Sequence, residues 1–147
     1  MRNRSSGVRK PSQRRTSRPV SGTRLNGSEP IVDGMQLVPL PGHTPGHTGY
    51  EFSSKGQKIL FWGDIVHALR VQLQHPEVTA IFDIDQTAAA ATRHQLLPKL
   101  AREDVLIAGP HMSFPALGRL YKEGSGYSWA PVVFTDQWVE HAPSPQK

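Results

Sequence analysis

Hydrophobic residues in this chain form short runs separated by glycine, proline and polar positions. Residues 35–40 predict a strand, residues 49–52 alternate as in a second strand, and residues 58–62 predict a third. The polar, glycine-containing stretch between the last two favours a hairpin turn. Residues 105–108 have the continuous apolar character of a buried strand, and residues 128–134 predict a final strand.

One helix is predicted in the second half of the chain. Asp85 is a suitable N-cap for a helix from Gln86 to about Arg102, a segment rich in alanine and leucine. Pro98 is expected to kink this helix or end it early, because proline lacks an N–H and clashes with the preceding turn. Residues 67–76 predict a loop or a short helix. A strand hairpin, a helix and a further strand form an α/β pattern.

The apolar pattern begins near Ile31, and charge divides the chain near the same point. The first 24 residues hold eight of the 17 Lys and Arg residues and none of the 12 Asp and Glu residues. The formal charge of +5 therefore divides into +8 there and −3 in the remainder. We predict a disordered Arg/Ser-rich tail over 1–29, a domain over 30–139 and a C-terminal tail over 140–147. No aromatic residue interleaves with the arginines, which favours a solvated tail over a nucleic-acid-binding arm.

The composition excludes several classes of site. The chain contains no cysteine, so a metal site would have to use histidine and carboxylate, which suits zinc and also iron, manganese or cobalt. No apolar run approaches the roughly 20 residues that span a membrane. The basic start is not followed by the apolar segment of a secretory signal. We therefore expect a cytoplasmic protein with no membrane partner.

Three strand ends each carry a residue of metal-ligand type beside a glycine. His43 lies in a loop bent by glycine and proline, Asp64 follows the run that ends at Gly63, and His111 follows Gly109-Pro110. Any one of these residues alone is more often structural or solvated. The coincidence of three at strand ends favours a metal site.

The remaining histidines are weaker candidates. His47 lies four residues after His43, but proline and glycine between them argue against a helix that would align the two rings, so joint coordination is not the default. His67 and His75 lie in the unassigned loop, His94 on the predicted helix and His141 in the C-terminal tail. We predict that His47 serves loop structure and that the other four histidines have surface or packing roles.

These motifs resemble those of the metallo-β-lactamase superfamily. The segments 40–48, 61–64 and 109–111 are similar to motifs in the C-terminal half of that fold, and the similarity covers about residues 33–134. A finer resemblance, to the methyl parathion hydrolase-like branch, rests on further segments: Gly63-Asp64-Ile65-Val66-His67, Val71-Gln72, Phe82-Asp83, the Ala88–Ala91 run, Pro110-His111-Met112-Ser113-Phe114-Pro115 and Gly124-Ser125-Gly126-Tyr127-Ser128-Trp129.

The resemblance implies a fold, a site and a reaction. The family fold is an αββα sandwich of two similar halves, and this chain resembles the second half. By resemblance, His43 binds the first of two divalent metal ions, Asp64 bridges both, and His111 binds the second. Zinc is the first candidate for both ions. The implied activity is hydrolysis of a small-molecule ester, lactone, lactam or phosphotriester by metal-activated hydroxide.

The other half of the family site is missing from the sequence. That half carries a His-x-His-x-Asp-His motif, and the chain contains no His-x-His. His43 with Asp64, and His111 with the shared Asp64, give each metal two protein ligands, whereas catalytic zinc usually has three. The inner face of the half-sheet would also be exposed, which favours association with another copy or with a complementary chain.

Three interpretations remain open from the sequence. The chain is a fragment of a di-metal hydrolase, from a truncated gene, a shifted reading frame or a misassigned start. Alternatively, it is a half-enzyme completed by another chain. As a third alternative, it is a non-catalytic binding module whose basic arm contacts nucleic acid. Substrate-binding residues are not predicted beyond Phe114, for which lining a pocket near His111 and packing are weighted equally.

Overall fold

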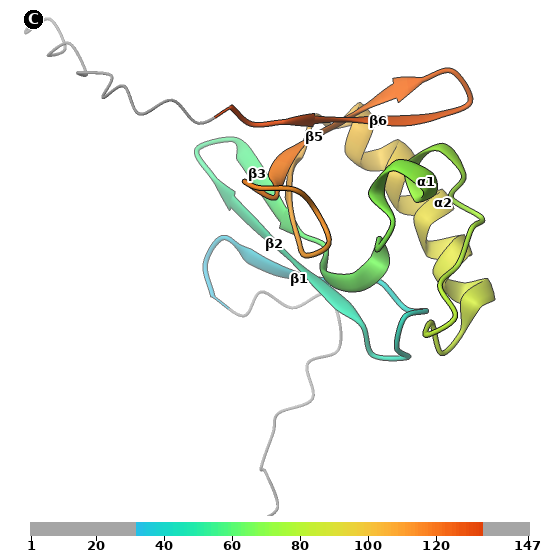
Figure 1. Cartoon of the computed structure of the whole chain (residues 1–147). Coiled ribbons are helices and arrows are strands. Elements are labelled where there is room, and N and C mark those ends of the chain that lie inside the picture. Colours follow the sequence, from blue (N-terminus) through green and yellow to red (C-terminus); the bar gives the residue numbers. More distant parts are fainter. Residues whose placement is uncertain (1–31, 134–147) are drawn as a thin grey trace, which may run out of the picture.

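The computed structural model describes residues 32–133, and the predicted tails over 1–29 and 140–147 lie outside this range. The described residues form one six-stranded mixed sheet with helices, in the order β1 to β6 (Figure 1). Its strands follow the chain: β1 Met35–Pro39, β2 Thr48–Ser54, β3 Gln57–Phe61, β4 Leu106–Ala108, β5 Leu117–Glu123 and β6 Gly126–Pro131. The fold is α/β, as predicted.

Strand direction places the three strand ends that precede the predicted ligands at one edge of the sheet. β1 and β3 both run antiparallel to β2, and β4 runs parallel to β3. The carboxyl ends of β1, β3 and β4 therefore meet at the same edge. The loops that follow these three strands carry the three predicted ligands. Trp62 donates its backbone N–H to the carbonyl of Ala108 at 3.1 Å, which extends the contact between the last two strand ends.

The long helix forms where the sequence predicts it. Helix α2 spans Gln86–Arg102, and the Asp85 side chain accepts a hydrogen bond from the N–H of Ala88 at 2.9 Å. The helix does not end early at Pro98, since it continues through this residue to Arg102, so that part of the prediction is wrong. Leu96, Leu97 and Leu100 flank the proline and are buried against the sheet, and this burial offsets the lost hydrogen bond.

Residues 67–76, predicted as a loop or a short helix, contain one short helix, and a 3₁₀ turn precedes them. The 3₁₀ turn η1 covers Gly63–Ile65, and α1 covers Leu69–Gln74. No helix within residues 32–133 has the length and apolar character needed to cross a membrane.

The C-terminal hairpin differs from the prediction. Strand β5 was not predicted, because Gly118, Arg119 and Lys122 interrupt its apolar pattern. The predicted strand over 128–134 is shifted, since β6 covers Gly126–Pro131 and is aligned by its pairing with β5.

The two faces of the sheet have different environments. On one face, Leu60, Ile107 and Leu120 are almost fully buried and form a core with the apolar side of α2. Figure 1 shows both helices on one side of the sheet. The strand register places a second apolar set on the opposite face: Met35, Leu37, Tyr50, Phe52, Ile59, Phe61, Leu106 and Ala108. On this open face, Tyr50, Phe52 and Phe61 are about two-fifths exposed, at 42%, 39% and 43%.

Candidate metal centre

The structure brings the three predicted ligands together around one carboxylate. His43 Nε2 lies 3.6 Å from one oxygen of Asp64, Oδ2. His111 Nε2 lies 3.2 Å from the other oxygen, Oδ1. Each carboxylate oxygen thus faces a different imidazole, an arrangement that is compatible with a carboxylate shared between two ions.

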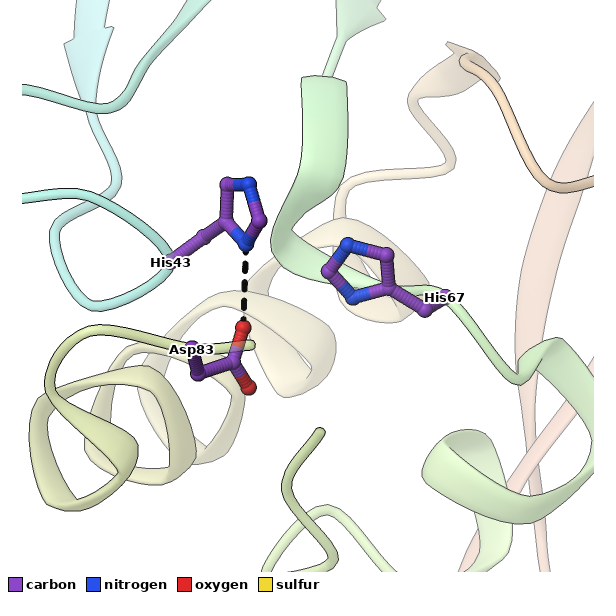
Figure 2. A group of neighbouring side chains, drawn as sticks. All are labelled: His43, His67 and Asp83. Carbon is purple, nitrogen blue, oxygen red and sulfur yellow. Dashed lines mark hydrogen bonds and ion pairs between the residues drawn. The ribbon is translucent and has the colours of Figure 1, made fainter. Parts of the chain in front are cut away.

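His43 is oriented by a buried carboxylate that the sequence reasoning did not assign to the site. Its Nδ1 lies 3.1 Å from Oδ1 of Asp83, whose side chain is fully buried (Figure 2). The second oxygen of Asp83 accepts the N–H of Ala80 at 3.0 Å. With Nδ1–H donated to Asp83, the lone pair of His43 is on Nε2, the atom that faces Asp64. Imidazoles that bind metals are commonly oriented by a carboxylate in this way.

His47 is held by the backbone of its own loop and of the next one. Its Nδ1 lies 2.9 Å from the carbonyl of Leu40, and its Nε2 accepts the N–H of Asp64 at 2.8 Å. These contacts require the proton on Nδ1 and leave no free ring nitrogen, so the prediction that His47 serves loop structure is confirmed. Gly63 has φ 58°, and a Cβ there would lie 2.5 Å from His47 Nε2. The close contact with His47 therefore requires glycine.

His67 was predicted to have a surface or packing role, but it lies between the two histidines predicted as ligands, His43 and His111. Its ring centroid lies 4.9 Å from that of His43 and 4.8 Å from that of His111. Figure 2 shows its side chain pointing toward the space beside His43 and Asp83. Burial lowers the pKa of His67, although the charge of Asp83 acts in the opposite direction. A sequence signal existed, because His67 follows Asp64 by three residues on the same loop.

His111 has an exposed side chain and an unusual backbone. Its side chain is 45% exposed, and its φ of 61° lies in the left-handed region that non-glycine residues rarely adopt. Conformations of this kind concentrate at functional sites. The other predicted surface histidines of the described range, His75 and His94, are exposed.

Arg93 of α2 anchors the segment that carries His67 and Asp83. Its guanidinium is fully buried and donates to three backbone carbonyls, those of Pro76, Ile65 and Val78, at 2.8, 3.0 and 2.9 Å. Burial lowers its pKa, and the nearby charge of Asp83 opposes that shift. Hydrogen bonds from Arg93 therefore hold the segment 65–78 against α2.

The spacing of these donors fits a divalent ion. Zinc bonds of about 2.0–2.1 Å in tetrahedral geometry place two ligand atoms about 3.3 Å apart. The separations of 3.2 and 3.6 Å between Asp64 and its two imidazoles bracket that value. Two groups of three residues have ligand atoms within 4.8 Å of one another: His43, His67 and Asp83, and Asp64, His67 and His111.

Comparison with solved structures identifies hydrolases with this fold. The hydrolase AbOPH of the β-lactamase superfamily is 40% identical with a TM-score of 0.68, over 71% of this chain and 36% of that one. AidC, a dizinc quorum-quenching lactonase, is 28% identical with a TM-score of 0.71, over 78% of this chain and 38% of its own. A probable metal-dependent hydrolase from Staphylococcus aureus, 16% identical with a TM-score of 0.59, agrees in fold.

No family model and no curated protein matches the sequence. The chain spans little more than a third of the length of AbOPH and AidC. The described residues have the fold of the C-terminal half of a metallo-β-lactamase αββα sandwich, and the solved neighbours are hydrolases of that superfamily. Both conclusions agree with the resemblance found in the sequence.

Proposed function

We propose that this chain supplies the C-terminal half of the active site of a metal-dependent hydrolase. The observation that carries the proposal is the placement of Asp64, with one carboxylate oxygen toward His43 and the other toward His111. Bound divalent ions, with zinc as the first candidate, would polarise the substrate and lower the pKa of a water molecule. In this proposal His43 and His111 hold one ion each and Asp64 holds both.

The surrounding residues position these ligands. Asp83 fixes the tautomer and direction of His43, and His47 fixes the backbone of Asp64 from the neighbouring loop. Both are positioning residues, because their polar atoms are used within the protein.

We further assign the chain to the methyl parathion hydrolase-like branch and propose an ester, a lactone or a phosphotriester as substrate. The branch motifs in the sequence support the branch, and the 40% identity to AbOPH supports the superfamily. The similarity to AidC, which is a lactonase, makes lactones the first substrates to test. A groove of about 540 Å³ is lined by α1, by the β5–β6 hairpin, and by Ser113 and Phe114, of which Phe114 is 91% exposed. The groove contains none of the predicted ligands, but Ser113 follows His111 by two residues, so we propose that the groove holds the organic part of the substrate.

The open face of the sheet is proposed as the surface that receives the complementary half. Its aromatic residues are too exposed to be a finished core, and the two neighbours are nearly three times longer than their matched segments. Contiguous apolar surface of this kind commonly marks an interaction site. The complement would also have to bring the missing metal ligands, and it could belong to a longer form of this chain or to another chain.

A graft tests the proposed function. Residues 32–133 would replace the matching segment of AbOPH, and the product would be assayed for hydrolysis of lactones and phosphotriesters with and without a chelator. We expect hydrolysis that requires metal and that is abolished by Asp64→Ala. Ser54→Ala, on an exposed strand end, is the control. A folded graft without metal-dependent hydrolysis of any of these substrates would contradict the proposal.

A further inference from the structure

We propose that this chain by itself binds one divalent transition-metal ion, such as Zn²⁺ or Co²⁺, through Asp64, His67 and His111. His67 takes a ligand role that neither the sequence motifs nor the resemblance assigned to it. The three residues come from two loops at the same sheet edge, and their ligand atoms lie within 4.8 Å of one another. Two imidazoles, a carboxylate and an open position form a donor set that is typical of catalytic zinc.

The state of the His67 ring supports this assignment. Its Nδ1 is buried and has no hydrogen-bond partner among the described residues. A buried polar nitrogen without a partner is costly, so such a group in a native protein calls for an explanation. The ring of Phe82 packs edge-on against His67 with centroids 4.7 Å apart, which limits its reorientation. No hydrogen bond among the described residues uses a ring nitrogen of His67, so the imidazole is not committed to another contact and can serve as a ligand.

The other three-residue group is less suited to hold the ion. Both oxygens of Asp83 are already occupied, one by the Nδ1 of His43 and the other by the N–H of Ala80. Its side chain is fully buried, so a metal there would have to displace two hydrogen bonds in the interior. Asp64 is 39% exposed in its side chain and has oxygens available beside His111. The geometry therefore favours the group around Asp64.

This inference rests on the metal site of the proposed function but concerns binding by the chain alone. In the proposed hydrolase, the ligands that complete each ion come from the complementary half. In the isolated chain, His67 supplies the third ligand. The three ligand atoms lie within 4.8 Å of one another, and ligands of one zinc ion lie about 3.3 Å apart, so binding requires them to approach by at most about 1.5 Å. The two ideas therefore fail on different measurements, since this one does not depend on hydrolysis.

The full 147-residue chain would be titrated with Co²⁺ and with Zn²⁺, and binding would be measured by calorimetry. The Co²⁺ form would also be studied by proton NMR. We expect one ion per chain and two strongly shifted, exchangeable imidazole N–H signals, from His67 and His111. His67→Ala should remove one of these signals. The His67→Ala change should also weaken metal binding. Loss of a residue that is hydrogen-bonded to a metal ligand weakens metal binding roughly 10–100-fold, and loss of the ligand His67 should weaken it by more. His75→Ala, which removes an exposed histidine, is the matched control and should change neither.

Each alternative outcome overturns the inference. A wild-type chain that binds no ion overturns it, as does His67→Ala protein that binds with wild-type affinity and both signals. Binding that is lost in His43→Ala but retained in His67→Ala would also overturn it, while agreeing with the proposed function. Circular dichroism would check that each variant is folded. If His67→Ala does not fold, His67→Gln carries the same expectations, because glutamine fills the space without an imidazole.

Discussion

The two histidines on either side of Asp64 are held in different ways. His43 is mostly buried, with its side chain 19% exposed, and its Nδ1 is fixed by the buried Asp83. His111 is 45% exposed, lies on a left-handed backbone and contacts Asp64 through Nε2. The first arm of the site is therefore organised within this chain. The second is more exposed to solvent.

The largest expected effect comes from replacing Arg93, which holds the segment before Asp83, the residue that orients His43. Arg93→Met removes three hydrogen bonds made by a buried guanidinium. The carbonyls of Ile65 and Pro76 lose this donor, while that of Val78 keeps a hydrogen bond from the side chain of Gln72. We expect a loss of about 3–5 kcal/mol in the free energy of unfolding. Urea denaturation would measure it. Arg102→Met, on the same helix with a side chain 73% exposed, should change stability by less than about 0.5 kcal/mol. Similar losses in both variants would show that Arg93 does not anchor the site.

Removing the two histidines should give opposite changes in stability. His43→Ala leaves the buried Asp83 carboxylate without its imidazole partner and should cost about 1–3 kcal/mol. His111→Gly relieves a left-handed backbone, so we expect no loss and a gain of up to about 1 kcal/mol. Thermal unfolding of the metal-free variants would compare them. A loss of stability in His111→Gly as large as that in His43→Ala would remove the contrast between the arms.

His47 tests how the carboxylate shared by both arms is positioned. His47→Ala removes the acceptor for the Asp64 N–H and the donor to Leu40, so we expect a loss of about 1–2 kcal/mol and weaker metal binding. His47→Gln can retain an acceptor near the Nε2 position and should recover part of the metal affinity. Calorimetric metal titration of both variants would decide. Equal affinity in the two variants would mean that His47 contributes only packing.

The smallest expected effect is a change of tautomer without a large change in stability. Nitrogen NMR shifts of the metal-free protein should show His43 with its proton fixed on Nδ1, and Asp83→Asn should weaken that preference. His111 has no corresponding carboxylate on its Nδ1 among the contacts in residues 32–133, and its Nε2 lies 3.2 Å from Asp64, so its proton should prefer Nε2. Identical tautomer populations for the two rings in the wild type would contradict the difference in their support.

The comparison also explains what the sequence could predict. Glycine and proline mark the ends of the strands, so the positions of His43, Asp64 and His111 at one edge followed from short-range patterns. The Asp85 cap was predictable for the same reason. Pro98 was misjudged because burial of the neighbouring leucines, a tertiary effect, outweighs its local preference.

Residues that act across the fold were harder to predict. Asp83 and Arg93 are distant in sequence from the groups they hold, and the spacing to His43 is 40 residues. Their roles depend on how α2 packs beside the loops, which no local pattern encodes. His67 was assigned to an ambiguous loop, although its place three residues after Asp64 put it within reach of the site. Strand β5 was missed because its pairing, more than its apolar pattern, defines it.

The most direct test of the central claim, that Asp64 is shared by two metal ions, is the metal count of the AbOPH graft that carries residues 32–133. Native mass spectrometry after loading with zinc should show two ions per molecule, and the Asp64→Ala graft should retain at most one. A folded graft that binds no zinc, or an Asp64→Ala graft that still binds two ions, would contradict the account.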